Sequence, residues 1–414
     1  MLTPKDVFTP GRPPLARAEV YAHRGQPERD FALAIERGLV PIVHGEFGVG
    51  KTSLARHALL SAERAGRLVN VESASGKSFV DVIKTILEHL GYEVTRSRTA
   101  HTVETSTTTA GGEAGLALVP LLSAKLTSQR ARASAKGETL VRELAVGAPT
   151  DSKVLELCER ARLVLIVDEL HAASPELLAD LTAFVKAASN KPCKHFRVVL
   201  LGTARDATRL VKHDPGVDRI IVEIALTTLS EAESRSLVEE GMRALAVEMP
   251  PAVLDRAARV TAGSPALVQW VALEMAELAV KRNPRRVEEE DLQRAVANYV
   301  RTKAKRLERA YTTAAESTGA RRYRKQILLA MAQLDDELVT MEALVAQVSK
   351  QLGEQVTSTS LSAPLRALKS EEHGEIVRDV EGDARGRFTF RDPSMRPFLR
   401  MREAGEREGL FSEA

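Results

Sequence analysis

The feature that most constrains this chain is a glycine-rich octapeptide between an apolar run and a helical segment. Residues 45–52 read Gly-Glu-Phe-Gly-Val-Gly-Lys-Thr, which fits the pattern G-x-x-x-x-G-K-[ST]. The run at 39–43 before it is short and apolar, and the segment 53–65 after it has a helical pattern. We therefore expect a buried strand, a tight loop and a helix in that order.

This order suits the binding of a nucleoside triphosphate. Glycines let successive backbone N–H groups turn toward phosphate oxygens, and the helix N-terminus adds its positive dipole end. Lys51 would carry positive charge to the β- and γ-phosphates, and the Thr52 hydroxyl would ligate Mg²⁺. The expected cofactors are ATP and Mg²⁺. The expected nucleotide-binding residues of the loop are Gly45, Glu46, Phe47, Gly48, Val49, Gly50, Lys51, Thr52 and Ser53.

A second apolar run, at 163–167, ends in two adjacent carboxylates. In a nucleotide hydrolase, such a strand end brings Asp168 to the metal and Glu169 to the γ-phosphate. Glu169 is then the candidate for orienting the attacking water. The alternative is that the two acids cap the next helix.

Two further catalytic candidates flank later strands. Thr203 follows the run 197–201 and could hydrogen-bond the water or the γ-phosphate, although small polar residues are also common in ordinary turns. Arg219 precedes the run 220–224 and could reach a nucleotide held by a neighbouring subunit, as an arginine finger does. The alternative for Arg219 is an ordinary salt bridge.

The pattern along the chain predicts three parts. Strands at 39–43, 67–71, 163–167, 197–201 and 219–224 alternate with helices, which indicates a parallel sheet, and a β-hairpin insertion is expected at 92–127. Helical segments fill 230–302. Three helices near 321–333, 340–352 and 360–369 and a hairpin of 375–380 and 387–391 then follow the order of a winged helix. The expected domains are 1–229, 230–302 and 303–414.

Composition indicates the cellular environment of the protein more than its function. The formal charge of +3 is small for 414 residues, so no overall field demands a nucleic-acid partner. Cys158 and Cys193 have neither the CxxC spacing nor neighbouring His pairs of a metal site, and we expect reduced thiols. The N-terminus has no apolar signal segment and no later run is long enough for a membrane span. We expect a cytoplasmic protein that does not bind membranes.

In this sequence order, the motifs resemble those of the AAA+/STAND division of P-loop ATPases over residues 15–300. The resemblance rests on 45–52, Val167-Asp168-Glu169, Leu201-Gly202-Thr203 and Thr261-Ala262-Gly263-Ser264-Pro265. It implies an α/β fold with strand order 5-1-4-3-2, a helical lid and adenine near Val20, Tyr21 and Arg24. It also implies that Gly263, Ser264 and Pro265 contact the nucleotide. The same three residues would also make an ordinary helix stop and start.

The resemblance leaves two functions open. Many ring-forming members have an arginine directly after the lid motif, whereas here Ala266 follows Pro265, which favours a STAND-like switch that signals to an unidentified protein partner. The C-terminal winged helix is similar to that of archaeal-type STAND, origin-recognition and transposition-helper ATPases. This similarity allows a DNA-bound ATPase and a homo-oligomer in the ATP-bound state.

The residues offer mixed support for duplex DNA as a partner. A cluster suited to phosphate contact consists of Arg301, Lys303, Lys305, Arg306, Arg309, Arg321, Arg322, Arg324 and Lys325. The segment 360–369, which would enter the major groove, offers only Arg366 and Lys369, so base-specific recognition is poorly supported. Docking of the winged helix within the molecule is the alternative use of these charges.

Overall fold

The computed structural model describes residues 2–11, 21–73, 76–93, 142–143, 152–190, 193–315, 323–334, 336, 338–380 and 386–410. Contacts divide the chain into two compact units. The first contains Met1–Asp30, His44–Leu60 and Ala225–Ala414, and the second contains Phe31–Val43 and Ser61–Ile224.

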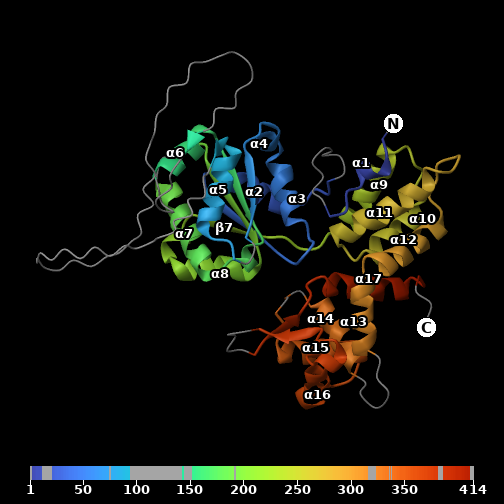
Figure 1. The fold of residues 1–414 in the computed structure, drawn as a ribbon. Coiled ribbons are helices and arrows are strands. Elements are labelled where there is room, and N and C mark those ends of the chain that lie inside the picture. Colours follow the sequence, from blue (N-terminus) through green and yellow to red (C-terminus); the bar gives the residue numbers. More distant parts are fainter. Residues whose placement is uncertain are drawn as a thin grey trace, which may run out of the picture. The chain divides into compact units, whose positions relative to one another are not determined.

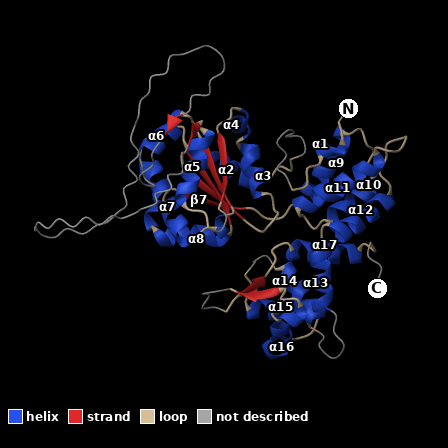
Figure 2. Ribbon diagram, viewed as in Figure 1, coloured by secondary structure: helices blue, strands red, loops and turns tan. Residues whose placement is uncertain are grey.

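Five strands form the central sheet (Figure 2). They are β1 (Val40–His44), β2 (Leu68–Glu72), β5 (Val164–Asp168), β6 (Arg197–Gly202) and β7 (Ile221–Ala225). Their spatial order is β2-β5-β6-β1-β7, which is the predicted order 5-1-4-3-2 read from the other edge. The pairs β2–β5 and β5–β6 are parallel, with Val164 opposite both Leu68 and Arg197. Every residue of β5 is buried, as expected for a central strand with helices over both faces.

Several helices lie beside the strands (Figure 1), and some of them share the buried apolar cluster of the sheet. In α5, Val82, Ile83 and Ile86 are fully buried and recur at helical spacing, so one face of the helix joins the core of the sheet. The helices of this part are α2 (Gln26–Glu36), α3 (Lys51–Ala58), α4 (Leu60–Arg64), α5 (Phe79–His89), α6 (Ser152–Arg160), α7 (Pro175–Asn190) and α8 (Ala204–His213), with 3₁₀ turns at Leu170–Ala172 and Pro215–Val217.

The structure differs from one expectation for this region and describes only part of another. The helix predicted at 53–65 begins earlier, at Lys51, and is interrupted at Leu59, where the amide bonds back to Ala55. Of the expected hairpin insertion, the structure describes Tyr92–Glu93 (β3), which pairs in parallel with Arg142–Glu143 (β4). The rest of that prediction, at 94–127, lies outside the described residues.

After β7 the chain becomes helical, as predicted. The lid comprises α9 (Glu231–Ala244), α10 (Pro251–Val260), α11 (Pro265–Ala279) and α12 (Glu289–Thr302), and α1 (Pro4–Val7) packs on α11. A C-terminal module follows, with the predicted order of three helices and a hairpin. It comprises α13 (Lys305–Ala315), α14 (Arg324–Gln333), α15 (Met341–Leu352), α16 (Ser358–Leu368), the 3₁₀ turn Glu371–His373, antiparallel β8 (Val377–Asp379) and β9 (Phe388–Phe390), and α17 (Met395–Arg407).

One apolar core runs through both the lid and the C-terminal module. Met275 of α11, Leu307 of α13 and Phe398 of α17 belong to the same cluster of buried side chains. The lid and the module are therefore one packed body rather than two domains on a free tether. Among the described residues, no helix has the length and apolar composition needed to cross a bilayer.

A buried carboxylate closes the start of α12. The Asp291 side chain is 0% exposed, accepts a 2.7 Å hydrogen bond from Arg282 and accepts the amide of Glu288 at 2.9 Å. Burial alone would raise the pKa of Asp291, but these hydrogen bonds outweigh it and hold the pKa below its usual range. Because the ionised form is favoured in the folded state, this contribution to stability is present above about pH 4 and is lost as pH falls through the lower folded-state pKa.

We expect Asp291→Ala to lower the free energy of unfolding of this region by about 1–3 kcal/mol at pH 7 and by much less near pH 3. Urea denaturation at both pH values, followed by fluorescence of the chain's single tryptophan in the neighbouring α11, measures this. Glu290→Ala is the control, because that side chain is 70% exposed. Equal losses at the two pH values would contradict the assigned role of the charge.

Candidate functional site

The loop 45–52 joins β1 to α3 in the predicted way. Gly50 is the N-cap of α3 with φ of 94°, so the helix begins at Lys51. The Lys51 ammonium donates to the carbonyls of Gly45 at 2.9 Å and Glu46 at 3.0 Å. A lysine that folds over its own loop at a helix N-terminus marks the position where phosphate oxygens would be held.

The connector between β7 and α9 holds this loop by direct backbone contact. The amide of Leu226 donates to the carbonyl of His44 at 2.7 Å. A Cβ atom at Gly45 would lie only 2.1 Å from the carbonyl oxygen of Leu226. Glycine is therefore required here for packing as well as for access to phosphate.

Arg24, predicted near the adenine, bridges the loop, the connector and the lid. Its guanidinium donates to the carbonyls of Val49, at 3.0 Å, and Thr227, and lies 3.7 Å from the carboxylate of Glu233 on α9. The side chain is 7% exposed, and this burial lowers the pKa of Arg24. Its role in the structure is thus to fix the backbone around the loop.

Tyr21 lies beside the same helix. Its ring stacks on His57 of α3 at 3.8 Å between centroids, and His23 meets both rings edge-on. Burial lowers the pKa of His57, so its neutral form is favoured. No local pattern predicts this role of His57, because Tyr21 lies thirty-six residues earlier in the chain. Val20 lies outside the described residues.

The lid motif lies against the phosphate loop within the first unit. Gly263 has φ of 70°, Ser264 is the N-cap of α11, and Pro265 is its first residue. A Cβ atom at Gly50 would be 3.8 Å from the Pro265 ring. The motif thus ends α10 and starts α11, as the structural alternative proposed, and Pro265 lies near Gly50 of the loop.

The two carboxylates lie at the end of β5, as predicted. Asp168 is buried and accepts the amide of Glu169 at 2.8 Å. Glu169 has a left-handed φ of 56°, and its carboxylate lies 3.2 Å from His171. The next long helix, α7, is capped by Ser174, which accepts from Leu177. Neither acid is used for that cap.

Thr203 and Arg219 have different surroundings. Thr203 follows β6, the strand next to β5, so it lies at the same sheet edge as Asp168. Thr203 is the N-cap residue of α8, and its amide and hydroxyl donate to the buried Asp206 at 2.7 Å and 3.0 Å. Arg219 is exposed in the turn before β7. Both catalytic roles stay predictions.

Residues 35–211 match the family described as AAA domain. No curated protein sequence matches the chain.

Solved structures similar to the chain include three archaeal proteins. A Walker-type ATPase of Pyrococcus abyssi has 16% identity and a TM-score of 0.48, covering 93% of this chain and 97% of that chain. The ORC2 protein of Aeropyrum pernix with ADPNP and ADP has 14% identity and a TM-score of 0.49, covering 98% and 99%. The ORC1 protein of Aeropyrum pernix in complex with DNA has 16% identity and a TM-score of 0.44, covering 99% and 98%.

The phosphate loop has one strong contact that its sequence does not predict. The carboxylate of Glu46 is held by Arg396 and Arg400 of α17. The available signal was the spacing of the arginines, because residues four apart lie on one face of a helix. Nothing in the sequence named Glu46, 350 residues away, as their partner.

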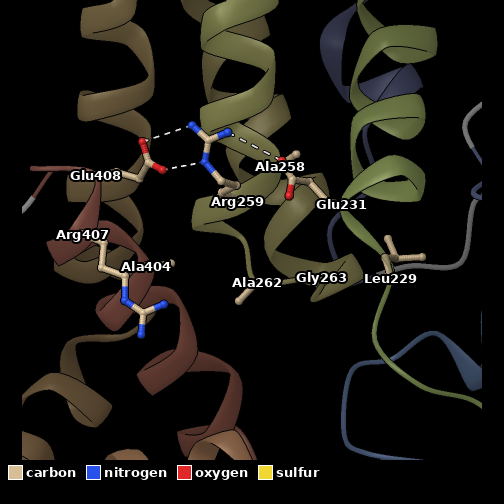
Figure 3. Close-up of a pocket in the computed structure, with 9 residues that line it drawn as sticks. All are labelled: Leu229, Glu231, Ala258, Arg259, Ala262, Gly263, Ala404, Arg407 and Glu408. Carbon is tan, nitrogen blue, oxygen red and sulfur yellow. Dashed lines mark hydrogen bonds and ion pairs between the residues drawn. The ribbon is translucent and has the colours of Figure 1, made fainter. Parts of the chain in front are cut away.

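A separate cavity of about 310 Å³ lies beside the lid motif (Figure 3). Arg259 of α10 spans it, 2.6 Å from Glu408 and 3.6 Å from Glu231. The Arg259 hydrogen bond lowers the pKa of Glu408. Gly263 lines the cavity, but no residue of the phosphate loop 45–52 does. This cavity is therefore distinct from the phosphate site.

The close packing of Gly45 against the Leu226 carbonyl can be tested by substitution. We expect Gly45→Ala to lower stability by about 3 kcal/mol or more, because the added methyl group must displace the Leu226 backbone. Gly48→Ala is the matched control: its φ is 79°, but nothing lies within 4 Å, so about 1 kcal/mol is expected. Thermal unfolding of the two variants compares them. Equal losses would show that the contact has no energetic weight.

Proposed function

We propose that this chain is an ATP-dependent switch, in which residues 45–53 bind Mg²⁺-ATP and the lid and C-terminal module respond to it. The observation that carries the proposal is the packing of three elements on one loop. Arg24 bonds to Val49, the connector after β7 packs on Gly45, and Pro265 of the lid motif lies near Gly50. A change in this loop is therefore transmitted directly to the lid.

Hydrolysis of ATP to ADP and phosphate is assigned to the acidic strand end. Asp168 supplies a buried carboxylate, and Thr52 supplies a hydroxyl in the first turn of α3. These are hard oxygen donors of the kind that Mg²⁺ takes together with phosphate oxygens and water. Bound Mg²⁺ supplies positive charge to the phosphates. Glu169 orients the attacking water, and its 44% exposure leaves its carboxylate accessible to solvent.

The DNA-bound alternative has weaker support from the described residues. Lys303 lies 5.0 Å from the ring of Trp270, Arg306 pairs with Asp392, and Lys325 lies 3.6 Å from Glu406. Arg324 is buried. These side chains have partners within the protein, while Arg306 stays 78% exposed and Lys325 47% exposed. Arg321 and Arg322 lie outside the described residues. The switch is therefore the preferred function.

Substitution of the two assigned groups tests binding and turnover separately. Lys51→Ala should abolish nucleotide binding, because the ammonium group that would contact the phosphates is lost. Glu169→Gln should retain binding and lower turnover at least about a hundredfold, because the water is no longer polarised. Titration with a fluorescent ATP analogue and a phosphate-release assay, with and without duplex DNA, measure both. Normal turnover by Glu169→Gln would disprove its role.

Mixing variants tests whether Arg219 acts on a neighbouring subunit. Lys51→Ala and Arg219→Ala should each be inactive alone, and their mixture should regain part of the activity, because an intact loop then meets an intact arginine. Asp218→Ala is the control for the same exposed turn. No recovery in a mixture that forms oligomers, with normal activity of Arg219→Ala alone, would exclude the finger.

A further inference from the structure

Two arginines of α17 grip the phosphate loop through one side chain. Arg396 lies 3.0 Å from Oε1 of Glu46, and Arg400 reaches Oε2 at 2.9 Å and Oε1 at 3.1 Å. Arg396 is 3% exposed, Glu46 15% and Arg400 17%. Paired, largely buried and partly fork-like contacts of this kind are stronger than surface salt bridges. We call these three side chains the Glu46 latch.

The arginines of the latch are themselves fixed by the C-terminal module. Arg396 donates to the carbonyls of Leu334 at 2.6 Å and Asp336 at 2.7 Å, just past the end of α14. Arg400 donates to the carbonyl of Ala332 at 2.5 Å. These bonds satisfy carbonyls that a helix C-terminus leaves without partners. These bonds fix the two guanidinium groups independently of their contact with Glu46.

The other end of α17 is fixed to the lid. Glu408 pairs with Arg256 at 3.1 Å and with Arg259 at 2.6 Å, both on α10 (Figure 3 shows the second contact). Because the lid and the module also share one core, α17 carries the position of the lid to the latch. The latch must break if the lid moves away from the loop.

Glu46 also contacts the lysine that would hold the phosphates. Its backbone carbonyl accepts the Lys51 ammonium at 3.0 Å, while its carboxylate is held by α17. One residue thus joins the predicted phosphate contact to the C-terminal module.

We propose that the Glu46 latch controls the release of nucleotide, by holding the lid and the C-terminal module closed on the phosphate loop. This inference rests on the proposed nucleotide site and adds its regulation. A closed lid retains nucleotide, so a partner that separates α17 from Glu46 would speed exchange. By linkage, bound nucleotide stabilises the latched form to the same extent.

The variant Glu46→Gln separates the latch from simple charge effects. Removing a negative charge close to the phosphates should by itself slow release of ADP or ATP. Loss of the ion pairs should instead speed it, by about tenfold. Stopped-flow displacement of a fluorescent ADP analogue from the full chain measures the rate. Faster release supports the latch, and unchanged or slower release overturns it.

A double-mutant cycle checks that the two partners act together. Arg400→Gln should also speed release about tenfold, and the double variant Glu46→Gln/Arg400→Gln should be no faster than Glu46→Gln alone, because Glu46→Gln already removes the ion pair with Arg400. Rates that multiply to about a hundredfold would show independent effects and overturn the proposal. Arg407→Gln is the matched control on the same helix, since that side chain is 71% exposed and pairs with Glu403.

Hydrogen exchange without nucleotide separates failure of the latch from failure of the proposed function. Glu46→Gln should speed amide exchange at 45–50 and 395–400 relative to the unsubstituted chain. If that chain binds no nucleotide, the proposed function fails, and the exchange data still judge the contact. If nucleotide binds but exchange and release are unaltered by Glu46→Gln, only the latch fails.

Discussion

The structure depends on a close approach between backbone segments that are distant in sequence. The connector after β7 passes the phosphate loop and the lid motif in succession, and a Cβ atom at Gly45 or at Gly263 would each meet a connector carbonyl at 2.1 Å. Hydrogen bonds from Leu226 to His44 and from Leu229 to Gly263 fix the same approach. The connector thus packs against both the phosphate loop and the lid motif. Arg24 adds a hydrogen bond to the connector at Thr227. A switch that senses phosphate needs such a shared element.

Much of the fold could be predicted because its signals are local. Apolar runs such as 163–167 can only be buried strands in this pattern, and the glycine-rich loop fixes which strand precedes the first helix. The strand order followed from the family resemblance and is confirmed. The ends of α3 and α4 were less predictable, because a break at Leu59 depends on local packing rather than on a proline or glycine. Asp168 and Glu169 could be predicted as site residues because they follow the apolar run 163–167 directly.

The contacts that were missed all join distant residues. Nothing near Glu46 distinguishes it from any other residue at a variable position of the motif, and its partners on α17 lie at the opposite end of the chain. The stack of Tyr21 on His57 likewise joins residues that are distant in sequence. Charge patterns in a sequence show that arginines are present but not which carboxylate they neutralise. The predicted basic cluster illustrates this, because Arg306 and Lys325 pair within the protein.

The continuous core of the lid and the C-terminal module has a mechanical consequence. Because Met275, Leu307 and Phe398 are packed into one cluster, bending between these helices would open apolar surface to water. If the lid moved relative to the phosphate loop, the C-terminal module would therefore move with it as one piece. A partner bound to the module would then act on the loop without touching it.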